Sequence, residues 1–264
     1  MESTVEKKEK NAPKGEAQPS PLAGNRFATY QLPPNKDILV NALIYAESGV
    51  GKTEFAVELA KHYKVLYLNA EKSLSTIQNH PLRKEIQPNL DIIDVSTWEE
   101  ISNAFSCAYE GTGKYKWVIV DSLTDLNRCA KDEILSVAKE ADSLSLREWG
   151  KVSLRMEKIV RYFRDLKINT MFIALSKNIK NDSTQETKAF PAIAGSLKEE
   201  CPAMVDLCGY MYTYDSGEES KQGRAIQFFN SPRAIGKDRF DKLETEILPR
   251  SGGCTAILKK LGLL

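Results

Sequence analysis

The feature that most constrains this chain is the stretch at residues 43–59, LIYAESGVGKTEFAVEL. An apolar run enters a loop that contains Gly49 and Gly51, and the loop continues into a segment with helical spacing of its apolar residues. A glycine-rich turn between a buried strand and a helix directs successive backbone N–H groups at one point, where they can bind phosphate oxygens. The stretch therefore predicts an α/β fold with a phosphate-binding loop at one edge of its sheet.

Each position of this loop has its own expected task. Lys52 would reach the β- and γ-phosphates of a nucleotide, and the hydroxyl of Thr53 would bind Mg²⁺. Ala46 stands where the G-x-x-x-x-G-K-[ST] pattern has its first glycine, a position that serves the turn more than the phosphate contact. The nucleotide-binding residues expected here are Ser48, Gly49, Val50, Gly51, Lys52, Thr53 and Glu54.

Short apolar runs alternate with longer amphipathic stretches from residue 37 onward, which is typical of βα units around a mainly parallel sheet. The expected strands lie at residues 38–46, 64–70, 90–95, 116–122 and 170–176, and the expected helices at 52–63, 97–109, 125–139 and 146–166. In the last helix, five apolar residues are expected to share one face: Leu154, Ile159, Tyr162, Phe163 and Leu166.

Three parts of the chain lie outside this alternation of strands and helices. Residues 1–25 are rich in Lys, Glu, Pro, Ser and Gly, so we expect a disordered tail before one domain at residues 26–264. Residues 207–214 and 224–230 predict an antiparallel pair that extends the sheet. The polar residues 177–198 predict a long loop.

Composition narrows the class of protein further. The net charge of +1 favours no partner class, and no apolar run approaches the ~18 residues that would cross a membrane. Five scattered cysteines without a CxxC pair argue against a zinc site and a disulfide framework. A cytoplasmic location is the expectation that follows.

Two carboxylates complete the expected site. The apolar residues 117–120 deliver Asp121 to a strand end, where it would bind Mg²⁺ directly or through water, as a Walker B Asp does. Glu71 follows the strand after the loop's helix and would lie at the carboxyl edge of the sheet. There it would activate the attacking water, although an exposed carboxylate at a helix start is the alternative.

The order of these motifs resembles that of the RecA-like P-loop ATPases over roughly residues 37–240. In that family a D-A-E-type motif carries the catalytic Glu, and a later strand ends in D-S; NAEKSL with Glu71 and IVDSL with Asp121 resemble these motifs. The resemblance implies a RecA-like fold, ATP and Mg²⁺ as cofactors, catalysis by Lys52 and Glu71, and self-association. The compact size and the sequence GKDRF resemble the phage-encoded branch related to single-strand annealing and recombination proteins.

The resemblance also implies roles for residues after the Walker B strand. Ser176 stands where the family has a γ-phosphate sensor, often Gln or His. The following segment would contact single-stranded DNA, although a solvated loop explains its lysines as well. The residues expected to make this contact are Lys177, Lys180, Lys188 and Phe190.

Two further elements resemble subunit contacts of the family. Lys237 and Arg239 in AIGKDRF resemble the basic pair that reaches a neighbour's ATP, and a solvated strand end is the alternative. Phe27 in NRFATY either contacts a neighbouring subunit or packs within its own domain.

The leading hypothesis is therefore a Mg²⁺-dependent ATPase, dependent on an oligomer and on DNA, that acts on single-stranded DNA in recombination, annealing or repair. A nucleotide-gated assembly protein with little turnover and a P-loop small-molecule kinase are the alternatives, although no arginine-rich kinase lid is evident. Expected partners are single-stranded DNA, further copies of the chain and a single-strand-binding or replication protein, in the host cytoplasm if a phage encodes the chain. The sequence leaves open DNA versus RNA or protein as partner, and ring versus filament.

Overall fold

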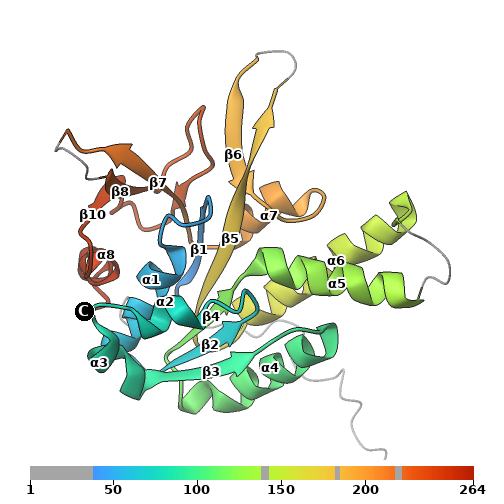
Figure 1. Cartoon of the computed structure of the whole chain (residues 1–264), viewed down its shortest axis with the longest axis horizontal. Helices are drawn as coiled ribbons and strands as arrows, with labels where there is room; N and C mark the ends of the chain where they lie inside the picture. Colours follow the sequence, from blue (N-terminus) through green and yellow to red (C-terminus); the bar gives the residue numbers. More distant parts are fainter. Residues whose placement is uncertain (1–37, 138–142, 182–184, 218–221) are drawn as a thin grey trace, which may run out of the picture. The chain divides into compact units, whose positions relative to one another are not determined.

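Parallel strands form the centre of one sheet, which has the order β10-β8-β7-β1-β5-β4-β2-β3 (Figure 1). The computed structural model describes residues 38–137, 143–181, 185–217 and 222–264. The expected tail at residues 1–25 and the expected contact of Phe27 lie outside the described residues. The strands are β1 Asn41–Ala46, β2 Val65–Asn69, β3 Leu90–Asp94, β4 Trp117–Asp121, β5 Asn169–Lys180, β6 Thr187–Pro191, β7 Leu207–Asp215, β8 Gln222–Gln227, β9 Lys237–Asp238 and β10 Thr245–Leu248.

Helices cover both faces of this sheet, and strand alternation explains the two layers. In β1, Leu43 and Tyr45 face the layer of α4, α5, α6 and α7, whereas Ala42 and Ile44 face α1, α3 and α8. The helices are α1 Lys52–Val57, α2 Leu74–Gln78, α3 Arg83–Ile86, α4 Trp98–Glu110, α5 Leu123–Val137, α6 Leu146–Arg164, α7 Leu197–Met204 and α8 Gly253–Leu261. Short 3₁₀ helices follow at η2 Glu58–Lys61, η3 Gln87–Asn89 and η4 Gly111–Gly113.

The strand directions confirm the predicted α/β class, a mainly parallel central sheet flanked by helices with an antiparallel extension near the C-terminus. Strands β7, β1, β5, β4, β2 and β3 run parallel, whereas β8 and β10 add antiparallel strands beyond β7. The carboxyl ends of β1, β2 and β4 therefore lie at one edge of the sheet. In the part of the chain that the structure describes, no helix is long and apolar enough to cross a membrane.

The buried face of α6 differs from the predicted one. Leu154 and Tyr162 are 59% and 54% exposed, so they do not belong to the core face. The core face comprises Val152, Met156, Ile159, Val160 and Phe163. Their spacing follows the 3.6-residue period, whereas Leu154 and Tyr162 lie out of phase with it.

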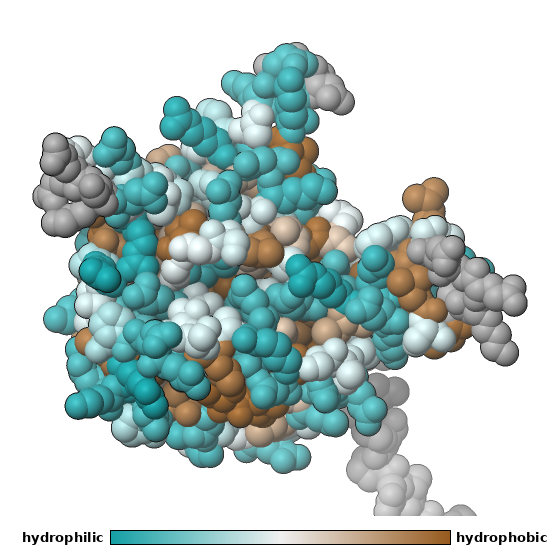
Figure 2. Space-filling view, in the orientation of Figure 1, coloured by the Kyte–Doolittle hydropathy of each residue, from teal (hydrophilic) through white to brown (hydrophobic). Residues whose placement is uncertain are grey.

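The predicted long loop at residues 177–198 is wrong where β5 and β6 form, at residues 177–180 and 187–191. Strand β5 runs on to Lys180 and pairs antiparallel with β6, from Ser176 opposite Pro191 to Lys180 opposite Thr187. Lys177, Asn178 and Lys180 of β5 are exposed, whereas Ala189 and Pro191 of β6 are buried. The backbone of Ala189 is also hydrogen-bonded to Arg233 and Ile235, so the β5–β6 hairpin is paired with the rest of the domain at its base. In Figure 2 hydrophilic residues cover most of the hairpin, which projects beyond the sheet at the top of the view.

Candidate nucleotide site

The loop between β1 and α1 has the backbone geometry that its glycines predict. Gly49 and Gly51 have φ angles of 80° and 100°, in the left-handed region that side chains with a Cβ avoid. Lys52 is 5% exposed, and its ammonium donates to the carbonyl oxygens of Ala46 at 3.3 Å and Glu47 at 2.8 Å. Burial lowers the pKa of Lys52, and the nearby charges of Glu71 and Asp121 counteract this effect. Lys52 is thus folded over its own loop, with two carboxylates close by.

Thr53 and Asp121 meet directly at the end of β4. The Thr53 hydroxyl donates to Asp121 Oδ2 at 2.6 Å, and the Tyr67 hydroxyl donates to the same oxygen at 2.8 Å. Asp121 is fully buried, and burial raises the pKa of its carboxyl. Its Oδ1 atom is buried and has no hydrogen-bond partner among the described residues.

These oxygens fit a magnesium ion. Mg²⁺ prefers oxygen ligands and is commonly bound by one or two carboxylates or hydroxyls together with substrate phosphates. Asp121 Oδ1 is buried and accepts no hydrogen bond from an N–H or hydroxyl group of the described residues. The Glu71 carboxyl can donate to the Asp121 carboxylate while it is protonated, and a cation is a partner that Asp121 can use when Glu71 is ionised. Thr53 and Asp121 are the residues that would hold the ion.

Glu71 lies beside Asp121 because β2 and β4 are neighbours. Asn69 pairs with Asp121, and the backbone N–H groups of Ala70 and Glu71 donate to the Asp121 carbonyl oxygen at 2.7 and 3.1 Å. Burial, reinforced by the charge of Asp121 and opposed by that of Lys52, raises the pKa of Glu71 to about 7. A carboxyl with this pKa can accept a proton near neutral pH.

Ser176 lies close to the same edge of the sheet. Its predecessor Leu175 pairs with Ala46, the last residue before the loop, and β5 runs between β1 and β4. The candidate sensor is therefore next to the phosphate loop in the sheet, as its place in the sequence predicts.

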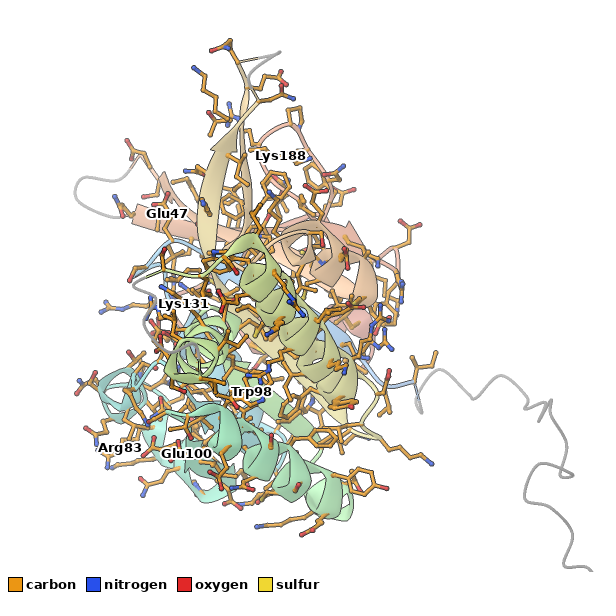
Figure 3. All side chains as sticks on the ribbon, turned by 90° about the vertical axis from the view of Figure 1, so that its right-hand side faces the viewer. Glu47, Arg83, Trp98, Glu100, Lys131 and Lys188 are labelled. Carbon is orange, nitrogen blue, oxygen red and sulfur yellow. The ribbon has the colours of Figure 1, made fainter. Side chains whose placement is uncertain are left out.

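The candidate DNA residues lie on the β5–β6 hairpin, and alternation divides them between its faces. Lys177 is directly opposite Phe190, and Lys188 lies on the same face, whereas Lys180 lies on the other face. Lys188 donates to Asn230 Oδ1 at 2.8 Å, and the Lys198 ammonium lies 5.8 Å from the centre of the Phe190 ring. Figure 3 shows Lys188 and Glu47 of the phosphate loop toward the same end of the molecule.

Lys237 and Arg239 lie far from the phosphate loop of their own chain. β9 pairs with the start of β7, which lies beside the start of β1, so both residues are at the sheet edge opposite the loop. Lys237 donates to the carbonyl oxygens of Pro202, Ala203 and Val205 at 3.3, 2.8 and 2.8 Å.

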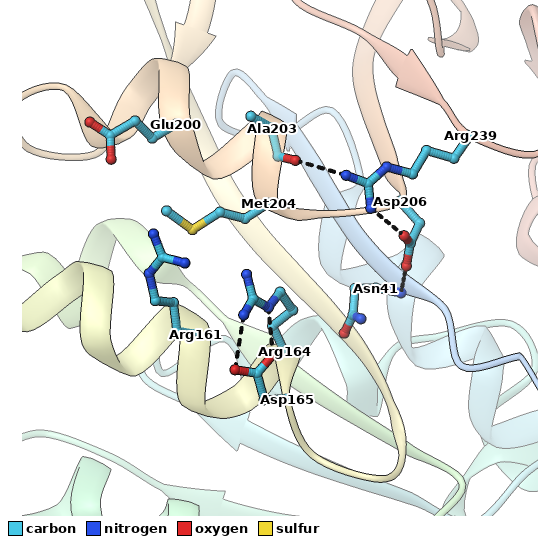
Figure 4. A pocket seen from close by; sticks show the side chains of 9 residues that line it. All are labelled: Asn41, Arg161, Arg164, Asp165, Glu200, Ala203, Met204, Asp206 and Arg239. Carbon is cyan, nitrogen blue, oxygen red and sulfur yellow. Dashed lines mark hydrogen bonds and ion pairs between the residues drawn. The ribbon is translucent and has the colours of Figure 1, made fainter. Parts of the chain in front are cut away.

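Arg239 is bound within its own chain as well. It donates to Asp206 Oδ1 at 2.9 Å and to the Ala203 carbonyl oxygen at 3.2 Å. Both contacts lie in a pocket of about 480 Å³ that Arg161 and Arg164 also line (Figure 4). A role at a neighbour's nucleotide would require Arg239 to leave these partners.

Two residues of the site were missed in the sequence. Tyr67 lies in an apolar strand that gives no local sign of its contact with Asp121, and only the adjacency of β2 and β4 makes the contact apparent. Arg224 of β8 forms an ion pair with Glu54, at 2.5 Å between Nη1 and Oε2, across 170 residues of chain. No short-range pattern signals a contact of that separation.

The sheet, the loop and the Thr53–Asp121 pair together define the class of the P-loop nucleoside triphosphatases. A family profile described as an AAA domain matches residues 40–240, which is most of the chain. The chain belongs to this AAA domain family. No curated protein matches the chain in sequence.

Two solved structures are similar to the chain at low sequence identity. The KaiC-like protein of the hyperthermophilic archaeon Pyrococcus horikoshii OT3 is 12% identical with a TM-score of 0.45, over 80% of this chain and 89% of that one. The flagellar accessory protein FlaH of Methanocaldococcus jannaschii is 12% identical with a TM-score of 0.41, over 79% of this chain and 84% of that one.

Proposed function

We propose that the protein is a Mg²⁺-dependent ATPase of the RecA type that acts on single-stranded DNA in recombination, annealing or repair. The observation that carries the proposal is the convergence of Thr53 at the start of α1 with Asp121 and Glu71 at the carboxyl ends of the neighbouring strands β4 and β2, beside Lys52. A phosphate loop alone supports nucleotide binding. A carboxyl with a pKa of about 7 next to the metal-side Asp adds the group that hydrolysis requires.

Each residue would have one task in the reaction. Lys52 would turn from the carbonyl oxygens of Ala46 and Glu47 to the β- and γ-phosphates, since a phosphate is the stronger partner for an ammonium. Mg²⁺, held by Thr53 and Asp121, supplies charge neutralisation at the phosphates when it is bound. Glu71 would orient the attacking water and accept its proton.

The β5–β6 hairpin supports the choice of DNA as partner. Lys177, Lys188 and Phe190 share one face, which offers two cations for phosphates and one ring for a base. Self-association, a phage origin and a cytoplasmic location complete the proposal. They follow from the resemblance of the sequence to the recombination branch of the family and from its cysteine usage.

The test measures phosphate release from ATP with and without single-stranded DNA, over a series of salt concentrations. We expect Mg²⁺-dependent phosphate release that single-stranded DNA stimulates. Rising salt should suppress this stimulation, because contacts to DNA phosphates release counterions and DNA binding therefore weakens as the salt concentration rises. Lys52→Ala should abolish nucleotide binding and release. Release that requires an added acceptor would favour the kinase, and nucleotide binding without turnover would favour the nucleotide-gated protein.

A further inference from the structure

Arg224 lies against the phosphate loop although it belongs to the antiparallel extension of the sheet. It pairs with Thr213 of β7 and Leu248 of β10, and its side chain is on the face that packs against α1 and α8. A Cβ added to Gly51 would collide with the Arg224 guanidinium. Gly51 therefore provides the room that lets this guanidinium reach the loop.

Three acceptors hold the Arg224 guanidinium in place, and only one of them carries a negative charge. Nη1 donates to the Glu54 carboxylate at 2.5 Å, and Nη2 donates to the carbonyl oxygens of Arg250 at 2.7 Å and Pro249 at 3.4 Å. The side chains of Arg224 and Glu54 are 19% and 23% exposed, so their ion pair is partly shielded from water. One carboxylate thus supplies the negative charge, and two main-chain oxygens orient the head.

We propose that Arg224 is a nucleotide-binding residue that exchanges the Glu54 carboxylate for the α- and β-phosphates of the bound nucleotide. This inference rests on the proposed nucleotide-binding function. Backbone N–H groups of a phosphate loop surround the α- and β-phosphates, and Gly51, which Arg224 contacts, belongs to that part of the loop. A guanidinium matches phosphate geometry with two parallel N–H donors, and a polyphosphate carries more charge than the carboxylate it replaces.

The exchange also accounts for Glu54. A carboxylate next to a phosphate site repels the ligand unless a cation neutralises it. When Arg224 turns toward the phosphates, Glu54 loses this cation; water can solvate the carboxylate, which is already partly exposed, and its remaining repulsion of the phosphates lowers the affinity for nucleotide. The pair would therefore couple the β8–β10 part of the sheet to occupancy of the nucleotide site.

The experiment compares the affinities of four proteins for ATP and for ADP by isothermal titration calorimetry in the presence of Mg²⁺. We expect Arg224→Ala to weaken the binding of both nucleotides about 10- to 100-fold, because the loss of a hydrogen bond to a charged group lowers affinity by roughly that factor. ATP and ADP should be affected equally, since both carry α- and β-phosphates. Glu54→Gln should tighten the binding of both nucleotides, because it removes the carboxylate charge that competes with the phosphates for Arg224.

The fourth protein, Glu54→Gln with Arg224→Ala, separates contact from neutralisation. If Arg224 contacts phosphate, this double variant should bind about 10-fold or more weakly than Glu54→Gln alone. If it binds as tightly as wild type, Arg224 acts only by neutralising Glu54, and the proposal is overturned. Arg224→Lys, which keeps the charge and loses the planar fork, should recover only part of the affinity; full recovery would overturn the paired-donor contact.

Two controls distinguish a failure of the proposed role of Arg224 from a failure of the proposed function or of folding. Lys260→Ala breaks a comparable ion pair, 2.6 Å from Glu246 on β10, and should leave nucleotide affinity unchanged. Thermal unfolding of each variant shows that it is folded. If wild type binds neither nucleotide, the proposed function fails; if wild type binds and Arg224→Ala binds equally well, only the role of Arg224 fails.

Discussion

The backbone N–H of Glu71 donates to the carbonyl oxygen of Asp121, with 3.1 Å between nitrogen and oxygen. This bond fixes the main chain that carries the candidate base to the strand that carries the candidate metal ligand. Glu71→Gln keeps the bond and the side-chain shape but removes the basic oxygen. We expect phosphate release to fall about 100-fold or more while ATP affinity is retained.

Glu47→Gln provides the matched control for this variant, because Glu47 is an exposed carboxylate in the phosphate loop. Phosphate release by this control should match wild type. Unchanged release in Glu71→Gln would show that another group activates water.

The pH dependence of hydrolysis should reflect the raised pKa of Glu71. Only the deprotonated carboxylate can accept a proton, and the pKa of about 7 replaces the ordinary value of 4.5. We therefore expect kcat/KM, which reports ionisations of the free enzyme, to fall as the pH drops through about 7. A profile that stays flat down to pH values near 5 would contradict the assignment of Glu71 as base.

Glu58 should be one of the chief determinants of stability near the site. Its buried carboxylate accepts from the backbone N–H of Gly252 at 2.6 Å and of Cys254 at 3.0 Å, which joins η2 to the start of α8. Glu58→Ala leaves both N–H groups without this acceptor and should lower the free energy of unfolding by about 2–4 kcal/mol. Chemical denaturation measures the change.

A surface ion pair close to Glu58 supplies the comparison. Glu85 is half-exposed and lies 2.9 Å from Lys61. Glu85→Ala should change the free energy of unfolding by less than about 1 kcal/mol, because exposed pairs contribute little. Equal effects of the two substitutions would show that the Glu58 contacts are not specific determinants of stability.

The phosphate loop and the Walker B strand could be predicted because their signals are local. Gly49, Gly51 and the apolar run before Asp121 each define a backbone environment within a few residues. The contacts of Tyr67 and Arg224 could not be predicted, because they depend on which strands become neighbours. The hairpin after Ser176 was not predicted because polar side chains dominate the exposed end of β5, and the alternation in β6 covers only the five residues Thr187–Pro191.

The β5–β6 hairpin permits a test of DNA binding with an internal control. If its Phe190 face contacts single-stranded DNA, Lys177→Ala should weaken binding and reduce the slope of log K against log salt by about 0.7. Lys180→Ala removes a lysine from the opposite face of the same hairpin and should have a smaller effect. Fluorescence anisotropy with a labelled oligonucleotide over a salt series distinguishes the two, and equal effects would contradict a one-sided contact.

The proposed role of Arg239 in trans can be tested by mixing two inactive proteins. Lys52→Ala lacks a working nucleotide site but keeps Arg239, whereas Arg239→Ala keeps the site and lacks the cation. Arg239 lies at the end of the sheet opposite its own phosphate loop, so it could act only on the nucleotide of another subunit. In a mixed assembly, some interfaces should join the intact nucleotide site of an Arg239→Ala subunit to the intact Arg239 of a Lys52→Ala subunit. We expect phosphate release to return on mixing, in proportion to the fraction of such interfaces. A mixture that stays inactive, although both variants fold and associate, would contradict the role in trans and would leave Arg239 as the partner of Asp206 within its own chain.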